Sequence, residues 1–153
     1  MIPYEEIIKL LEKNKIKYKA LEHEPVYTCE QAAKIRGVSP DSGVKALLIK
    51  SKEKFVLILL QGNKKLDSKK LRRATDIKDF RFATPEEVVD IMHCEIGACY
   101  PFGNIINLET FADIGLGGLE EINFNAGDHR KSIQMKWADF DKIVKPKIID
   151  IGK

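Results

Sequence analysis

Residues 44–60 read VKALLIKSKEKFVLILL, and this segment decides the fold class. Two apolar runs, 44–49 and 55–60, are separated by the polar link Lys50–Lys54. Short apolar runs on either side of a polar turn predict an antiparallel hairpin of two core strands. The sequence therefore predicts a β-sheet built around this hairpin.

Helix signals lie on both sides of the predicted hairpin. Apolar residues at helical spacing predict a helix over 4–14, and a capping-box pattern at Thr28 predicts a second helix that ends before Gly37. Asp67 is expected to cap a short helix over 68–74, and Thr84 to open a helix through 92 with proline at its first position. A last helix is expected over 137–143, and short strands are expected over 17–21, 105–108, 121–125 and 132–136. Since strands and helices do not alternate regularly, the pattern predicts one α+β domain over residues 1–153 with a mixed, mostly antiparallel sheet.

Length and composition exclude several classes of protein. With 153 residues, of which 44% are hydrophobic, the chain can bury a core and is not a disordered chain. No basic segment followed by an apolar run opens the sequence, so no secretory signal is expected. The longest strongly apolar run, 55–60, is far shorter than the roughly 20 residues of a membrane-spanning helix. The odd number of cysteines, Cys29, Cys94 and Cys99, suits a reducing compartment, and we expect a cytoplasmic protein.

Positive charge is concentrated in the middle of the chain, although the net charge is only +3. Residues 45–81 contain 12 Lys and Arg against 4 Asp and Glu, whereas residues 82–153 contain 7 against 12. Six cations within ten residues form a basic cluster: Lys64, Lys65, Lys69, Lys70, Arg72 and Arg73. The basic cluster is either a solvated helix face or a surface that attracts a phosphate backbone without reading its sequence.

Three segments could carry chemistry. Lys45 lies in an otherwise apolar strand, so its ammonium group either faces solvent or reaches into a cleft, where it could bind a phosphate or polarise a carbonyl. Residues 97–103, with glycine at both ends and Pro101 between them, form either a plain turn or a loop that offers N–H donors. His129 is either a surface residue or a group that donates to a carbonyl or transfers a proton.

The cysteines do not match a metal site. Cys94 and Cys99 with His93 lack the paired spacing of structural zinc sites, and neither a metal nor another cofactor is expected. Cys29 or Cys99 could instead pair with a histidine as a nucleophile, although neither lies in a recognisable nucleophile motif. An unrelated small hydrolase of this kind stays open beside incidental thiols.

An ordered set of motifs extends along nearly the whole chain. It comprises His23-Glu24-Pro25-Val26-Tyr27-Thr28, Gln31-Ala32-Ala33, Val44-Lys45-Ala46-Leu47, Gln61-Gly62-Asn63, Lys65-Leu66-Asp67, Lys70-Leu71, Ala83-Thr84-Pro85-Glu86-Glu87-Val88, Gly97-Ala98-Cys99-Tyr100-Pro101-Phe102-Gly103 and Gly127-Asp128-His129-Arg130-Lys131-Ser132-Ile133. In this order the motifs resemble the YbaK-like aminoacyl-tRNA deacylases, the free-standing relatives of the editing domain of bacterial prolyl-tRNA synthetase. The resemblance implies a strongly curved, barrel-like mixed sheet with flanking helices.

The resemblance also implies a trans-acting hydrolase that removes a wrongly attached amino acid from tRNA, here a small amino acid on tRNA-Pro, by attack of a positioned water. Lys45 would hold the substrate near the terminal adenosine, the backbone from Gly97 to Pro101 would face the ester, and His129 would line the aminoacyl pocket. Further substrate contacts are expected from Tyr27, Thr28, Phe102, Gly103 and Ser132.

The partners expected from the resemblance are the acceptor end of tRNA, met by the basic cluster, and a synthetase. Neither a membrane nor DNA is expected as a partner. The alternative function is a non-catalytic module of the same fold that binds tRNA or a synthetase.

Overall fold

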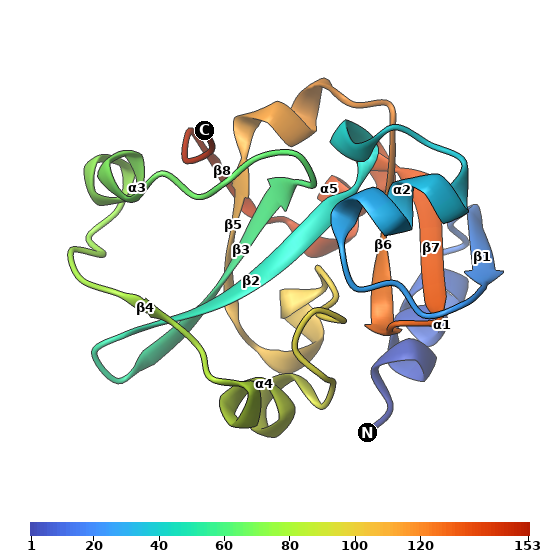
Figure 1. Cartoon of the computed structure of the whole chain (residues 1–153), viewed down its shortest axis with the longest axis horizontal. Coiled ribbons are helices and arrows are strands. Elements are labelled where there is room, and N and C mark those ends of the chain that lie inside the picture. The colour runs from blue at the N-terminus through green and yellow to red at the C-terminus, as the bar shows by residue number, and fades with distance from the viewer.

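Two β-sheets form the centre of the protein in this computed structural model, which describes residues 1–153 (Figure 1). The larger sheet has the strand order β4-β2-β3-β5-β8, with bounds Arg81–Phe82, Val44–Ser51, Lys54–Gln61, Glu109–Asp113 and Lys147–Ile149. The smaller sheet has the order β1-β7-β6, with bounds Tyr18–Glu22, Lys131–Lys136 and Glu121–Asp128. Only the β3–β5 and β5–β8 pairs are parallel, which confirms the α+β class and the mixed, mostly antiparallel sheet.

The predicted β2–β3 hairpin is confirmed. Its strands pair in continuous antiparallel register from Val44 opposite Gln61 to Ser51 opposite Lys54. Residues 56–60 of β3 have no exposed surface. Both faces of β3 are covered, and this double burial explains why its sequence is apolar throughout instead of alternating.

Five helices flank the sheets, and the capping residues define where they begin and end. Thr28 Oγ1 accepts the N–H of Gln31 at one end of α2, and Gly37 ends that helix with a φ of 71°. The side chain of Asp67 caps α3, and Thr84 forms a complete capping box on α4. None of these helices has both the length and the apolar character needed to cross a membrane. Their bounds are Pro3–Lys13 (α1), Cys29–Arg36 (α2), Ser68–Ala74 (α3), Pro85–Met92 (α4) and Trp137–Val144 (α5).

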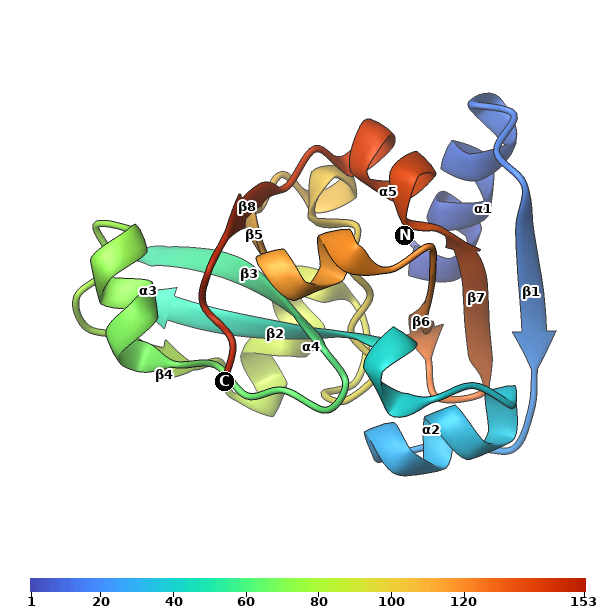
Figure 2. The same ribbon diagram turned by 90° about the horizontal axis from the view of Figure 1, so that it is seen from above.

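The two sheets meet at a single β-bridge between Gly43 and Asn123, and they do not close into a barrel. The smaller sheet lies with α1 and α2 at one end of the long axis, and α3 and β4 lie at the other end (Figure 2). β4 has only two residues and pairs with Ile49 and Lys50, so the rest of that β2 edge has no neighbouring strand. The structure therefore has two open sheets in place of the expected barrel-like sheet. The open edge of β2 lines a cavity that is described below.

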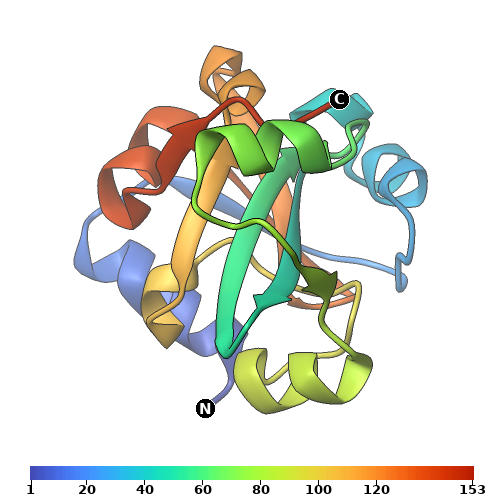
Figure 3. The same cartoon turned by 90° about the vertical axis from the view of Figure 1, so that its left-hand side faces the viewer.

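Buried side chains form one cluster on each face of the larger sheet. A cluster of 23 residues fills the space between the two sheets and includes Leu57 of β3 and Phe124 of β6. A cluster of 8 residues lies on the outer face, where Leu71 of α3 packs on strand residues that include Ile49. Figure 3 shows α3 crossing this outer face. Leu71 is the only buried residue of α3, and it packs this lysine- and arginine-rich helix against the sheet.

Three elements differ from the sequence expectations. The prediction of a strand over 105–108 is wrong, because residues Gly103–Ile106 form a short 3-10 helix and β5 begins only at Glu109. Asn107 ends that turn with a left-handed φ of 55°, which delays the extended backbone. The strands β4 and β8 were not expected, since two and three residues are too few to produce a hydrophobic period.

One ion pair joins β4 to the first turn of α4 and makes stability depend on pH. Arg81 Nη1 and Nη2 donate to the two carboxylate oxygens of Glu87 at 2.7 and 2.9 Å, and these bonds hold the pKa of Glu87 at about 2, below its ordinary 4.5. A depressed carboxyl pKa stabilises the fold above the unfolded pKa and loses that effect as pH falls toward the folded one. We expect Glu87→Gln to lower the melting temperature at pH 6, and the difference from wild type to shrink between pH 4.5 and 2. Thermal unfolding of both proteins across this pH range measures the difference in melting temperature. A difference that stays constant with pH would contradict a stabilising Arg81–Glu87 ion pair.

Candidate active site

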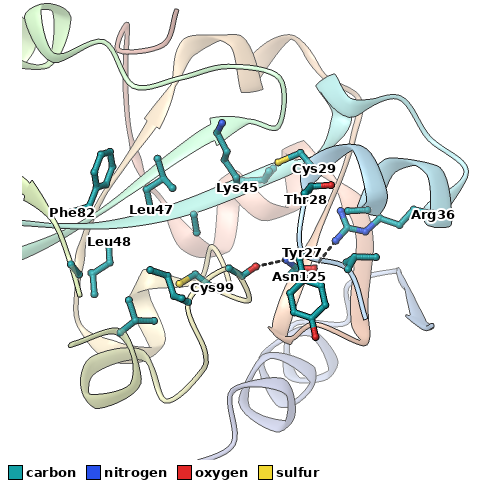
Figure 4. A pocket seen from close by; sticks show the side chains of 18 residues that line it. Tyr27, Thr28, Cys29, Arg36, Lys45, Leu47, Leu48, Phe82, Cys99 and Asn125 are labelled. Atoms are coloured by element: carbon teal, nitrogen blue, oxygen red, sulfur yellow. Dashed lines mark hydrogen bonds between the residues drawn. The ribbon is translucent and has the colours of Figure 1, made fainter. Parts of the chain in front are cut away.

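A cavity of about 370 Å3 opens beside the first half of β2, between α2 and the segment that contains β4 and α4 (Figure 4). Of its 18 lining residues 13 are hydrophobic, so the wall is apolar with a few polar groups. Its cationic and amide side chains are Arg36, Lys45 and Asn125. An apolar hollow with a few convergent polar groups is the usual form of a ligand site.

The edge of β2 that faces the cavity has no neighbouring strand along most of its length. The carbonyl of Leu48 accepts the N–H of Ala83 at this edge, just before the pairing with β4. Backbone groups two residues apart point to the same edge of a strand, so the N–H and C=O of Ala46 point to it as well. Ala46 lines the cavity. The cavity therefore contains a backbone donor and acceptor that no strand pairs.

Lys45 extends from β2 on the opposite face of the strand from Leu48, and its side chain lies on the side of Thr28 and Cys29 (Figure 4). The residue is half-buried, and no carboxylate lies within ion-pair distance of its ammonium group. The structure places Lys45 at the cavity and not on an open surface. Its positive charge is unpaired and can act on a ligand.

Gly97 forms another part of the cavity wall, in a backbone conformation that favours glycine. Its φ is 89°, and a Cβ at this position would lie 3.3 Å from Cε1 of His129. Asn125 Nδ2 donates to the Gly97 carbonyl at 2.9 Å. The N–H of the same peptide, from Ala98, donates to the carbonyl of Glu95 at 3.0 Å, so the peptide that follows Gly97 is held at both ends.

Arg36 extends from the last turn of α2 to the smaller sheet (Figure 4). Its Nε donates to Ser132 Oγ at 2.8 Å, and its Nη1 and Nη2 donate to the side-chain oxygens of Asn123 and Asn125 at 2.7 and 2.8 Å. All three acceptors are neutral, and no carboxylate pairs with this guanidinium. Burial lowers the pKa of Arg36 to about 10, so the group remains charged at neutral pH.

Four of the nine residues expected at the pocket line this cavity, and they are Tyr27, Thr28, Lys45 and Gly97. Four others lie inside the protein. Phe102 has no exposed surface and packs on Phe124 and Phe140 with ring centroids 5.4 and 5.3 Å away. The remaining three are the buried Pro101 and Gly103, which continue the same loop, and Ser132, which lies under Arg36. These four residues support the cavity from within and do not reach it.

His129, the ninth residue, lies behind the cavity wall. It lines a second, more open hollow of about 450 Å3. Its Nδ1 donates to the carbonyl of Val26 at 2.9 Å, and its ring packs on Tyr27 with centroids 4.5 Å apart. His129 therefore supports Tyr27 and Gly97 from behind.

The basic cluster lies in and next to α3, on the outer face of the larger sheet. Side chains an even number of residues apart on a strand share a face. Lys45 and Ile49 are four residues apart on β2, so both project to the face that α3 covers. Lys70 binds Asp150 at 3.1 Å, and Arg72 Nε donates to the carbonyl of Lys78. The other four cations form no ion pair, and they are Lys64, Lys65, Lys69 and Arg73.

The thiols do not form a nucleophile pair with a histidine. Cys99 and Cys29 line the cavity, but the hydrogen bonds of the His23 and His129 rings go to Glu24, Ser132 and Val26 instead. The neighbouring Cys99 thiol, together with burial, raises the pKa of Cys94. The Cys94 thiol in turn lowers the pKa of Cys99, but no histidine ring bonds to Cys29 or Cys99, so the geometry contains no Cys–His pair.

Sequence reasoning missed Arg36, Asn125 and the open backbone at Ala46. Asn123 and Asn125 alternate with buried Ile122 and Phe124 in β6, which was a readable signal of a polar strip inside the fold. Arg36 resembled an ordinary cation in the last turn of a helix. Its role depends on α2 packing over the smaller sheet, which no local pattern indicates.

The fold and the cavity together define an α+β domain with an apolar cavity at an open strand edge, beside a lysine that has no carboxylate partner. The model of the aminoacyl-tRNA editing domain matches residues 23–143, and the chain belongs to this family. The multifunctional Ser/Thr-tRNA deacylase ProXp-y of Escherichia coli K12 is 32% identical over 99% of this chain and 94% of its own length. The prolyl-tRNA editing protein ProX of Acetoanaerobium sticklandii is 29% identical over 91% of this chain and 88% of its own.

A solved structure gives the same fold. The crystal structure of a candidate trans-editing enzyme for prolyl tRNA synthetase superposes with a TM-score of 0.85 at 24% identity, covering 100% of this chain and 98% of that one. The similarity extends on both sides of residues 23–143, so the shared fold includes α1 and the C-terminal strand β8.

Proposed function

We propose that this protein is a trans-acting aminoacyl-tRNA deacylase of the cytoplasm, a hydrolase that cleaves the ester between a wrongly attached amino acid and tRNA. The observation that carries the proposal is the apolar cavity with an unpaired lysine and an open strand edge. The names of the E. coli deacylase and the A. sticklandii editing protein support the reaction class. The catalytic unit in this proposal is the whole chain, residues 1–153.

The reaction requires a positioned water and stabilisation of an oxyanion. An ester is activated toward water, so orientation and electrostatic stabilisation are sufficient without a covalent nucleophile. In the proposal, Lys45 binds the phosphate next to the terminal adenosine and adds positive potential near the developing charge. The backbone at Gly97 and the free N–H and C=O of Ala46 contact the reacting carbonyl and the water. Tyr27 and Thr28 form the wall on the side of α2.

His129 and Ser132 act indirectly in this proposal. His129 fixes Tyr27 and fills the space behind Gly97. Ser132 accepts the hydrogen bond from Arg36, and its hydroxyl contacts Nε2 of His23 at 2.7 Å. Both residues would shape the amino-acid end of the cavity by supporting its walls.

The proposed substrate is tRNA-Pro that carries a small amino acid, and a prolyl-tRNA synthetase is the proposed partner. A volume of about 370 Å3 must hold the aminoacyl group and part of the terminal adenosine, which leaves little space for a large side chain. The relatives named for Ser/Thr-tRNA and for prolyl-tRNA editing support this class of substrate. One methyl or hydroxyl group in such a pocket changes binding by about 1–3 kcal/mol, so discrimination among small side chains is modest.

A deacylation panel tests the proposed function. Purified protein is mixed with tRNA-Pro charged with alanine, serine, threonine, cysteine or proline, and loss of the labelled amino acid is followed with time. Faster hydrolysis than the spontaneous rate for at least one small amino acid is the expected result. Binding of tRNA without hydrolysis of any of them would favour the non-catalytic module instead.

The basic cluster leads to a separate prediction on tRNA binding. Lys69 and Arg73 are exposed, unpaired and one helical turn apart on α3, so both can contact phosphates. We expect Lys69→Glu with Arg73→Glu to weaken tRNA binding and to reduce the slope of log K against log salt by about 1–2. The matched control replaces Lys13 of α1 and Lys19 of β1 by glutamate. Both residues lie at the end of the protein that contains the smaller sheet, so this variant should keep a slope close to that of wild type. An unchanged slope in the α3 variant would reduce the basic cluster to a solvated helix face.

A further inference from the structure

The guanidinium of Arg36 is a partly buried cation whose only side-chain partners are three neutral oxygens. It lies at the junction of α2 and the smaller sheet, and it lines the cavity. An uncompensated buried charge is costly and persists only where its hydrogen bonds are well placed. The directions of those bonds therefore carry information about its role.

Arginine can only donate hydrogen bonds, and this fixes the orientation of the amide it contacts. Asn125 must turn Oδ1 toward Nη2 of Arg36, at 2.8 Å. Its Nδ2 then points the other way and donates to the carbonyl of Gly97 at 2.9 Å. A flipped amide would place two donors against each other on one side and two acceptors on the other.

The neighbouring Asn123 provides an internal comparison. It accepts from Nη1 of Arg36 at 2.7 Å, as Asn125 does from Nη2, but its Nδ2 donates to Ser42 Oγ at 2.9 Å. Asn123 forms no hydrogen bond with the Gly97 loop and does not line the cavity. Both asparagines thus accept a hydrogen bond from Arg36, and they differ in the group to which Nδ2 donates.

We infer that Arg36 is a positioning residue that acts through Asn125 to orient the Gly97 carbonyl at the cavity wall. This inference rests on the proposed deacylase function, in which the Gly97 backbone contacts the reacting ester. The guanidinium orients the Asn125 amide, and the amide holds the carbonyl end of the Gly97–Ala98 peptide, whose N–H end donates to the carbonyl of Glu95 at 3.0 Å. Gly97 alone would not hold this geometry, because glycine has a wide range of backbone conformations.

Asn125→Asp tests the relay, with Asn123→Asp as the matched control. Either aspartate gives Arg36 a carboxylate partner, so both variants should fold with a melting temperature at or above that of wild type. At position 125 the carboxylate has no donor for the Gly97 carbonyl and repels it. We expect kcat for deacylation to fall about 10- to 100-fold in Asn125→Asp with little change in KM. In Asn123→Asp we expect kcat to equal that of wild type.

The other outcomes overturn the inference, and they separate it from the proposed function. A wild-type kcat in stable Asn125→Asp, or an equal loss in Asn123→Asp, would contradict the relay while deacylation by the wild type still stands. A wild-type protein that hydrolyses none of the charged tRNAs would overturn the proposed function and the relay with it. If Asn125→Asp does not fold, Asn125→Ala carries the same test, because alanine also lacks a donor for Gly97.

Discussion

Lys45→Ala is expected to lower kcat/KM for hydrolysis of a mischarged tRNA by about 100- to 1000-fold, the largest effect of any single change at the cavity. The ammonium group is half-buried at the cavity and has no carboxylate partner, so its whole charge is available to the substrate. No other lysine lines the cavity and could replace it. Single-turnover deacylation of charged tRNA-Pro measures the rate.

The control for this prediction is Lys50→Ala, on the same strand but outside the cavity. Lys50 lies over the ring of Phe55 at 5.3 Å from the centroid and does not line the site. Its removal should leave deacylation at the wild-type rate. Lys45→Arg should restore only part of the activity, because the planar guanidinium is larger and shaped differently from an ammonium group. Full activity in Lys45→Ala would remove Lys45 from the mechanism.

Phe102→Ala is expected to lower the free energy of unfolding by about 3–5 kcal/mol. The ring has no exposed surface and contacts two other buried aromatic rings, so its removal leaves a cavity that the core cannot readily fill. Denaturant unfolding of wild type and variant measures the loss. The remaining folded protein should deacylate at the wild-type rate per molecule, since the side chain does not reach the substrate cavity.

Phe82→Ala is the matched control for Phe102→Ala, since it removes the same side chain from the cavity wall. Phe82 is 55% exposed, so its loss should change stability little and should raise KM for charged tRNA. The two phenylalanines therefore separate a core role from a binding role. A Phe102→Ala variant with unchanged stability and a raised KM would return Phe102 to the substrate pocket.

The helices and the central hairpin were predictable because their signals are local. Thr28, Asp67 and Thr84 each cap the helix that the sequence assigned to them, and the apolar runs of β2 and β3 pair as expected. β4 and β8 form only because a longer strand already lies beside them. Such strands depend on tertiary pairing, and no periodicity in two or three residues can indicate them.

The site was predictable only in part, for a related reason. Lys45 and Gly97 stand in motifs with recognisable neighbours, and both line the cavity. The contacts of Arg36 with Asn123 and Asn125 join positions more than 80 residues apart, so they become visible only when α2 is seen packed on the smaller sheet. Phe102 lies in a loop that looked like part of a pocket, but its ring turns into the core.

The open edge of β2 has a consequence for self-association. An exposed strand edge invites pairing with another chain, and proteins usually protect such edges with charge, bulges or covering segments. Here α2 on one side and the β4–α4 segment on the other recess the edge inside a cavity of about 370 Å3. The proposed substrate is a narrow, flexible tRNA end, which fits between these two walls. A strand of a second folded copy is wider, and the same walls hinder it from pairing along the edge. We therefore expect the recess that the proposed substrate enters to hinder edge-to-edge pairing of two copies as well.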